Sequence, residues 1–159
     1  MSKNLAVRSA LLDDTEAISQ LFRQRISTWQ RLDSDGRVED VTYKELRIHE
    51  RWSHGAASGP WMSIETGAIW LNYLILQRAV TLVLERAGSI IGYLEAYPGS
   101  EPKPYGKHLH IGQLIALEDD PRVKNALVQH LVEHAEKRTE RLTVAFSGYD
   151  KAAQDYYTQ

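Results

Sequence analysis

Apolar residues alternate with polar ones at the start of the chain and then change to a helical spacing. Leu5 and Val7 lie between polar neighbours, which predicts a short strand. An Asp13-x-x-Glu16 capping box follows. Apolar positions then recur every three or four residues, at Ile18, Leu21, Phe22, Ile26 and Trp29. This stripe predicts a first helix from about Asp14 to Arg31.

Two more helices are predicted before residue 80. The cluster Asp33-Ser34-Asp35-Gly36 indicates a turn, and Thr42-x-x-Glu45 is a second capping box. This box opens a helix to about Trp52 that carries Leu46 and His49 on one side. A glycine-rich loop ends that helix, and a third one begins at Ser63 or Ile64 with the sequence ETGAIWLNYLILQR. Because this segment is apolar nearly all round, we expect it to be buried. Trp70 in this helix and Trp29 in the first one both lie at helical core spacing, so we expect both to be core residues.

From Val80 onward the spacing is that of strands. Val80–Glu85 and Ser89–Tyr97 predict a hairpin, and the three prolines of Pro98–Lys107 predict a loop. The apolar strand HLHIGQLIAL then runs through an acidic turn into a helix from about Arg122 to Lys137. Leu142–Phe146 is a further strand and Lys151–Tyr157 a short helix. The order β-α-α-α-β-β-β-α-β-α predicts an α+β (α/β mixed-sheet) fold with helices on the faces of the sheet.

Composition narrows the function classes. The 159 residues fit one domain, and 43% hydrophobic with 25% charged residues is ordinary for a globular protein. The net charge of −2 gives no support for a nucleic-acid or membrane partner. With no cysteine, disulfides and thiol nucleophiles are excluded, which favours a cytoplasmic location. The N-terminus has no apolar run of signal-peptide length, and the most apolar segment, at about a dozen residues, is too short to span a bilayer.

Four segments together resemble the GNAT acyltransferase superfamily, over nearly the whole chain. They are residues 5–29, GSIIGYLEAY, HLHIGQL with the helix ALVQHLVEHA, and LTVAFSGYDKAAQDYY. The resemblance implies a single GNAT-like domain over residues 1–159, with a central, mostly antiparallel sheet flanked by helices. It also implies an N-acyltransferase that moves acetyl from acetyl-CoA to a small-molecule or peptide amine by direct attack.

The resemblance also assigns roles to residues. Tyr157 corresponds to the acid that protonates the leaving thiolate. His110 is the best match to the base, with Gln113 and Glu95 as lesser candidates, and a histidine suits this work because its pKa lies near neutrality. Trp52 and Trp61 are candidates for the acceptor pocket. The pantetheine would lie along Ile115, Ala116 and Leu117, and the pyrophosphate on amides of Arg122, Val123, Lys124, Asn125, Ala126 and Leu127.

The pyrophosphate segment departs from the family pattern Q/R-x-x-G-x-G/A. Arg122 fits the first position and Asn125 tolerates the left-handed conformation of the first glycine, but Leu127 does not replace the second. Asp120-Pro121 is also a good helix N-cap, whose carboxylate takes N–H groups that a pyrophosphate needs. The alternative is therefore a degenerate GNAT module without catalysis, acting as a ligand sensor or a dimerising scaffold.

The C-terminal end is a second departure. The family continues past the tyrosine with Gly-Phe and two strands, whereas this sequence ends at Thr158-Gln159. The strand near Leu142 is then left as an open edge, which natural proteins seldom leave bare. Either the sequence is a fragment of a longer one, or a second subunit in a homodimer covers that edge.

Two histidine pairs have alternative interpretations. His130-x-x-Glu133-His134 matches the H-x-x-E-H zinc motif, but His134 falls within the apolar stripe of its helix and no further ligand follows. We therefore predict a packed, hydrogen-bonded histidine pair and no metal. His108 and His110 share one face of their strand, as a base site or as a surface pair.

Overall fold

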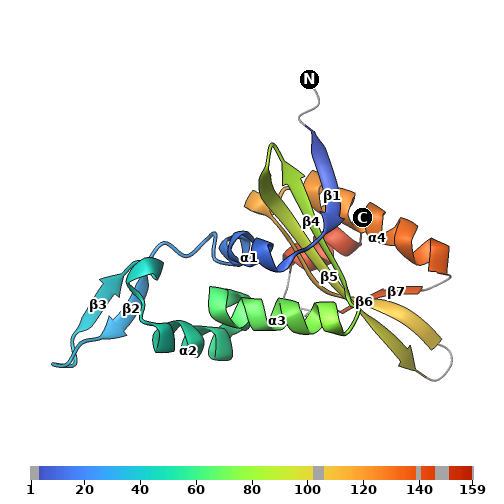
Figure 1. The fold of residues 1–159 in the computed structure, drawn as a ribbon. Coiled ribbons are helices and arrows are strands. Elements are labelled where there is room, and N and C mark those ends of the chain that lie inside the picture. The colour runs from blue at the N-terminus through green and yellow to red at the C-terminus, as the bar shows by residue number, and fades with distance from the viewer. Residues whose placement is uncertain (1–3, 102–105, 139–140, 146–150, 159) are drawn as a thin grey trace. The chain divides into compact units, whose positions relative to one another are not determined.

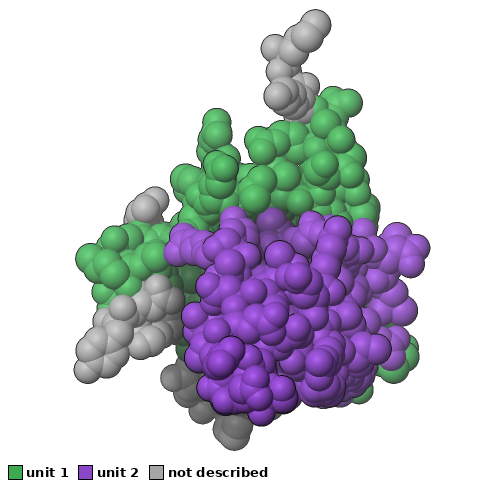
Figure 2. Space-filling model, turned by 90° about the vertical axis from the view of Figure 1, so that its left-hand side faces the viewer, with its two compact units in different colours: residues 1–10, 74–159 green, residues 11–73 purple. Residues whose placement is uncertain are grey.

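The computed structural model of the chain describes residues 4–101, 106–138, 141–145 and 151–158. Its contacts divide the chain into two compact units, which Figure 2 shows in green and purple. We call residues 1–10 with 74–159 the sheet unit, and residues 11–73 the helical unit. A single GNAT-like domain over residues 1–159 stays a prediction.

The sheet unit is built on a five-stranded sheet with the order β1-β4-β5-β6-β7 (Figure 1). Neighbouring strands are antiparallel except for β6 and β7, which are parallel. This confirms the predicted mixed, mostly antiparallel sheet. Its strands are β1 (Leu5–Ser9), β4 (Val80–Arg86), β5 (Ser89–Glu101), β6 (Gly106–Ala116) and β7 (Arg141–Val144), and its helices are α4 (Pro121–Arg138) and α5 (Lys151–Tyr157).

Helix α4 packs along one face of this sheet and forms the main core with it (Figure 1). Its buried stripe is Val123, Leu127, Leu131 and Ala135, as the helical spacing predicts. Gly92 on β5 lets the helix approach closely, because a Cβ atom there would lie 2.4 Å from Val123 Cγ1. The helix therefore rests on backbone at this point of the sheet.

Two hairpins connect the central strands. Between β4 and β5, Ala87 and Gly88 have φ angles of 51° and 80°, the left-handed pair that a tight turn requires. The predicted loop at Pro98–Lys107 is wrong for its described residues, because β5 continues to Glu101, β6 begins at Gly106 and Pro98 pairs with Leu109; residues 102–105 lie outside the described ranges. The pairing of β4 with β5 ends at Ala96, so no described strand pairs with the other edge of Pro98, where a strand tolerates proline.

The helical unit contains a small second sheet. Its elements are α1 (Thr15–Phe22), β2 (Trp29–Leu32), β3 (Val38–Val41), α2 (Ile48–Ser58) and most of α3 (Ile64–Leu76). The predicted helix from Asp14 to Arg31 is wrong beyond Phe22, since Trp29 begins a strand that pairs with Val41. Trp29 is buried against Val41, Leu46 and Tyr43, so a partner across the hairpin accounts for its burial. The predicted turn at Gly36 is confirmed, with a φ angle of 75°.

Helix starts in this unit differ in detail from the prediction. The Thr42 amide donates to Glu45 at 2.6 Å, which confirms that capping box, but the box closes only a 3₁₀ turn and α2 begins at Ile48. At the first helix Asp14, not Asp13, accepts a capping hydrogen bond, from the Leu11 amide. Helix α3 begins at Ile64 as predicted and ends at Leu76, two residues before the predicted end. It is not buried all round, because Ile69 is 57% exposed. No helix within the described ranges is both long and apolar enough to cross a membrane.

The contact at Gly92 predicts a specific loss of stability. Gly92→Ala should lower the free energy of unfolding by about 1–3 kcal/mol, because the new methyl group overlaps Val123 in a packed core. Urea unfolding measures this, and Ser89→Ala on the exposed start of β5 is the control. Adding Val123→Ala should recover part of the loss. If the two substitutions are simply additive, the helix does not rest on Gly92.

Candidate active site

A bulge in β6 determines the geometry of the candidate site. The partner of Glu95 on β6 is Gln113, whereas the partner of the next residue, Ala96, is Ile111. Gly112 is therefore an extra residue in β6. The Tyr97 ring covers it so closely that a Cβ atom at position 112 would lie 2.2 Å from Tyr97 Cε2. Bulges of this kind bend a strand and redirect its side chains.

The pairing of β6 with β7 stops just before this bulge. The parallel register runs from His108 with Arg141 to Ile111 with Val144. Strand β6 itself continues to Ala116 and stays paired with β5 as far as the partners Ala116 and Gly92. Beyond Ile111, the described residues therefore place no strand on the β7 side of β6. This edge is where an extended ligand could add backbone hydrogen bonds.

The register brings the three predicted base candidates to one face of the sheet. Glu95 pairs with Gln113, and Tyr97 pairs with His110. Directly paired residues project from the same face of a sheet. Leu94 and Ala96, the neighbours of Glu95 in β5, belong to the core under α4, so the candidates project from the opposite face.

Glu95 is a buried carboxylate held by two tyrosines. It is 1% exposed, Tyr93 Oη donates to its Oε2 at 2.7 Å, and Tyr97 Oη donates to its Oε1. Burial, together with the Glu95 carboxylate, raises the pKa of Tyr93 and of Tyr97 above the ordinary tyrosine value. Both phenols therefore stay protonated as donors, which satisfies Glu95 within the sheet and favours a positioning role for it.

The two histidines of β6 have different surroundings. His110 is half-buried, and its Nδ1 lies 2.9 Å from Thr143 Oγ1 on β7. This contact holds the ring near the end of the β6–β7 pairing through Nδ1, and the catalytic role of His110 stays a prediction. His108 is buried, with its ring over Gly99 and its Nδ1 3.1 Å from the Gly106 carbonyl oxygen. It therefore packs between strands and is not a surface residue.

Asp120 occupies the start of α4, as the sequence predicts. Its Oδ1 accepts the Arg122 amide at 2.9 Å, and its Oδ2 lies 3.0 Å from Arg122 Nη2. Its backbone carbonyl accepts the amides of Val123 and Lys124, each at 3.2 Å. The Arg122 guanidinium, and after it the Arg122 amide, lowers the pKa of Asp120, which keeps the cap ionised.

These contacts decide how well the helix start fits a diphosphate. The amides of Arg122, Val123 and Lys124 already have partners within the chain, so a diphosphate would have to displace Asp120 to use the Arg122 amide. The Lys124 ammonium lies 3.6 Å from Asp119, which partly neutralises it. The strand edge of β6 thus fits an extended cofactor arm, whereas the helix start in this conformation does not fit the phosphates.

The backbone around this turn differs from the prediction. Asn125 lies within α4, and the left-handed residues are Glu118 and Asp119, with φ angles of 54° and 53°. The backbone of these two acidic residues therefore has the left-handed conformation that glycine adopts without strain. Leu127 is a fully buried core residue under the sheet, which is why a glycine cannot stand there.

The tyrosine pair of α5 lies against the start of α4. Tyr156 Oη donates to Asn125 Oδ1 at 2.9 Å, and Lys124 Nζ lies 5.5 Å from the centre of the Tyr156 ring. Tyr157 packs edge-on against Tyr156, with the ring centres 5.0 Å apart. Burial, and after it the neighbouring Tyr156, raises the pKa of Tyr157 to about 12. Tyr157 is therefore fully protonated at neutral pH, as a general acid must be.

The other predicted contacts divide between the two units. In the sheet unit, Ile115 is half-buried, Ala116 buried and Leu117 exposed, at the open end of β6. In the helical unit, Trp52 is 42% exposed on α2, while Trp61 is 2% exposed and stacks on Phe22. Contact of either tryptophan with an acceptor stays a prediction.

The H-x-x-E-H segment is not arranged around a metal. Glu133 accepts a hydrogen bond from Gln129 at 3.2 Å, and the described residues hold no group of three histidine, aspartate or glutamate side chains placed to bind one ion. The prediction that both histidines of this segment are hydrogen-bonded is wrong for His134. Among the described residues, His134 Nε2 is buried and has no hydrogen-bond partner.

Comparison with known proteins shows the fold but not a close relative. No protein-family model matches the sequence, and no curated protein matches it. An aminoglycoside N-acetyltransferase solved in complex with CoA has a TM-score of 0.68 at 8% identity, covering 99% of this chain and 87% of that one.

Two bacterial structures agree with it. Ribosomal-protein-alanine N-acetyltransferase from Brucella melitensis biovar Abortus 2308 has a TM-score of 0.60 at 14% identity, covering 98% of this chain and 89% of that one. An N-acetyltransferase from Staphylococcus aureus Mu50 has a TM-score of 0.61 at 14% identity, covering 98% of this chain and 81% of that one. The chain therefore has the GNAT acetyltransferase fold.

The Glu95 cluster predicts a dependence of stability on alkaline pH. Unfolded tyrosine ionises at about pH 10, whereas folded Tyr93 and Tyr97 keep their protons to higher pH. Their contribution to stability is fully present below about pH 10 and is lost as the pH rises further, because the unfolded chain then binds fewer protons. Urea unfolding at several pH values measures this decline. Replacing both tyrosines with phenylalanine should flatten it, and an equally steep decline in the double variant would contradict the assignment.

Proposed function

We propose that this protein is an acyl-CoA-dependent N-acyltransferase that moves acetyl from acetyl-CoA to an amine by direct attack. The observation that carries the proposal is the open edge of β6 beyond Ile111, within a sheet whose fold is that of acetyltransferases along nearly the full chain. The acceptor in this proposal is a small molecule or peptide bearing a primary amine. The lack of cysteine supports the cytoplasmic location that the proposal assumes.

The cofactor arm would lie along the free edge of β6. Gln113, Leu114 and Ile115 follow the bulge and pair with β5, and no other described strand pairs with them. Backbone groups on their other side can therefore bond to the amides of pantetheine. Acetyl-CoA supplies the acetyl group as a thioester. The cationic side chains of Arg122 and Lys124 are then the nearest match to its phosphates, once the acidic cap has moved.

Proton transfer in the proposal uses His110 and Tyr157. The amine nitrogen attacks the thioester carbonyl carbon and forms the C–N bond, and the C–S bond breaks. His110 Nε2 takes the proton that the amine loses, with its ring held by Thr143. Tyr157 gives its phenolic proton to the leaving sulfur. Its phenol carries the proton at neutral pH, which this role requires.

A second candidate function rests on Asp120. If the cap never leaves the start of α4, the chain is a degenerate GNAT module that binds no acetyl-CoA and acts as a ligand sensor or a dimerising scaffold. The bidentate contact of Asp120 with Arg122 favours this alternative. The two functions differ in one measurable property, which is the affinity for acetyl-CoA.

Thermal unfolding with acetyl-CoA separates the two functions. Binding to the folded state at a hundredfold excess over Kd adds about 2.7 kcal/mol, which should raise Tm by about 5 °C or more. Pantetheine alone should give part of this shift, through the β6 edge. Asp120→Ala should lower Tm without ligand, because a lost N-cap costs about 1 kcal/mol, and yet it should increase the shift with acetyl-CoA. No shift for either protein at millimolar acetyl-CoA favours the degenerate module.

Tyr157→Phe should slow turnover while leaving acetyl-CoA affinity nearly unchanged. Loss of a general acid costs about 10²–10⁴ in kcat, since the thiolate then leaves without a proton donor. Tyr156→Phe is a matched control, because the Tyr156 hydroxyl bonds to Asn125 and has no part in the proposed chemistry. Turnover and affinity are measured for both variants with a panel of primary amines. An equal fall in kcat for the two variants would make the pair structural.

A further inference from the structure

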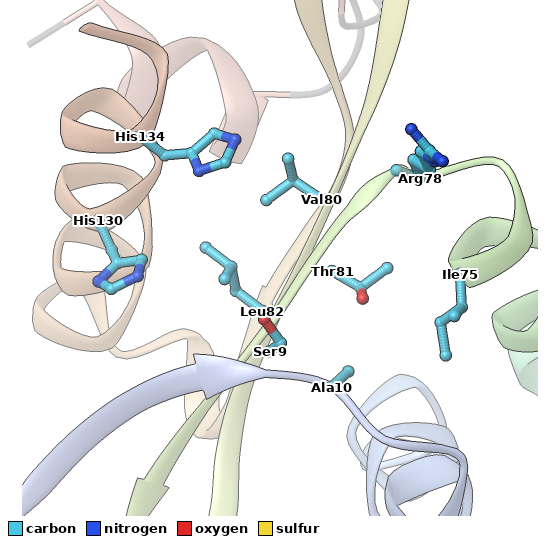
Figure 3. Close-up of a pocket in the computed structure, with 10 residues that line it drawn as sticks. Ser9, Ala10, Ile75, Arg78, Val80, Thr81, Leu82, His130 and His134 are labelled. Atoms are coloured by element: carbon cyan, nitrogen blue, oxygen red, sulfur yellow. The ribbon is translucent and has the colours of Figure 1, made fainter. Parts of the chain in front are cut away.

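A pocket of about 330 Å³ lies in the sheet unit, at the other end of the sheet from β6 and β7. Its walls come from the end of β1, the start of β4, the C-terminal half of α4 and the segment that follows α3 (Figure 3). A volume of this size suits a small-molecule ligand. The lining residues are Ser9, Ala10, Ile75, Arg78, Ala79, Val80, Thr81, Leu82, His130 and His134.

The frame of this pocket is fixed by backbone hydrogen bonds. Strand β1 ends at Ser9, which pairs with Leu82, and the Ala10 amide then donates to the Thr81 carbonyl at 2.9 Å. Helix α3 ends in a Schellman motif, with the Ala79 amide 3.0 Å from the Leu74 carbonyl and a φ angle of 56° at Arg78. The walls are therefore formed before any ligand binds.

His134 lines the pocket and carries a buried hydrogen-bonding atom that no described residue uses. Its ring projects from α4 toward Val80 (Figure 3), and within the described part of the chain no group bonds to its buried Nε2. A buried polar atom without a partner costs free energy and needs an explanation, which a bound ligand provides. His130 lies one turn earlier on the same side of α4, since residues four apart on a helix are neighbours.

The charges of the lining residues select the kind of ligand. None of the ten is acidic, Arg78 is a permanent cation, and His130 and His134 can each donate from a ring nitrogen. Half of them are apolar, namely Ala10, Ile75, Ala79, Val80 and Leu82. A strongly hydrated anion such as inorganic phosphate gains nothing from these apolar side chains, whereas an acid with a short hydrocarbon body buries it against them.

We propose that this pocket binds a small organic carboxylate, with His134 Nε2 donating to the carboxylate and Val80 and Leu82 contacting its hydrocarbon body. The Ser9 hydroxyl and His130 supply further polar contacts, and Arg78 makes the potential of the pocket positive. The site needs neither acetyl-CoA nor Tyr157, so it does not depend on the proposed transferase activity.

A titration with 3-methylbutanoate tests the proposal on the full chain at constant ionic strength. The nitrogen resonances of the histidine side chains are followed by NMR, with 3-methylbutanamide as the uncharged analogue and inorganic phosphate as the hydrated anion. We expect a saturable shift of His134 Nε2 with a Kd of about 1 mM, and at least about tenfold weaker binding of the amide and of phosphate. No saturable shift up to about 50 mM, or equal binding of the amide or of phosphate, overturns the proposal.

Variants separate a ligand contact from a structural effect. His134→Leu removes the donor and should weaken binding at least about tenfold, whereas His134→Gln keeps a donor at a similar reach and should restore most of it. His49→Leu, on the exposed surface of α2, is the matched control and should bind as the parent does. If His134→Leu folds and binds 3-methylbutanoate as tightly as the parent, the proposed contact is wrong.

Discussion

The extra residue in β6 is the constraint on which the rest of the sheet unit depends. Gly112 shifts the register between β5 and β6 and leaves room for the Tyr97 ring above the backbone. The bulge follows directly on the last pair of β6 with β7, and within the described residues no strand lies on that edge of the far half of β6. The same shift puts Glu95, His110 and Gln113 on one face while Leu94 and Ala96 stay under α4. The open edge and the polar face thus share one cause.

At the start of α4 two kinds of interaction compete for the same groups. Asp120 stabilises the helix with its carboxylate and its carbonyl, an arrangement typically worth about 1 kcal/mol. A diphosphate offers more negative charge to Arg122 and Lys124, but it must first displace the acidic cap. The energy of the cap is small compared with that of a tightly bound cofactor, about 8 kcal/mol at a micromolar Kd. On this comparison the cap would weaken the binding of a diphosphate without forbidding it, and this keeps the acyltransferase proposal ahead of the scaffold alternative.

The sequence predicts the sheet unit well because its signals are local. The alternation in β4 and β5, the Ala87-Gly88 turn and the buried stripe of α4 each depend on neighbours close in the chain. The predicted first helix failed at Trp29 because its burial comes from Val41 and Tyr43, across a hairpin that periodicity does not report. The extension of β5 through Pro98 was not predicted for a related reason. A strand tolerates proline where the neighbouring strand has ended, and the sequence around Pro98 does not show that the pairing with β4 ends at Ala96.

The candidate site was predictable in its types of residue but not in its arrangement. The Asp120 cap follows from an Asp-Pro pair ahead of a helix, and the structure bears it out. Tyr93 and Tyr97 lie two residues either side of Glu95 on one strand, a spacing that the sequence contains and the prediction did not use. The Thr143 contact of His110 and the Tyr156 bond to Asn125 join residues far apart in the sequence, which local patterns do not report. A helical pattern also does not show that His134 Nε2 has no hydrogen-bond partner among the described residues, because this depends on the side chains that face the helix.

The most direct measurement is a titration of isotope-labelled protein with CoA, followed through the backbone amide resonances. We expect saturable changes in the amide resonances of two groups of residues. The first is Gln113, Leu114 and Ile115 on β6, and the second is Arg122 and Val123, where Asp120 is displaced. Changes limited to the β6 edge would mean that the phosphates stay in solvent. If neither group of amides changes at millimolar CoA, the open edge of β6 is not a cofactor site and the acyltransferase proposal is contradicted.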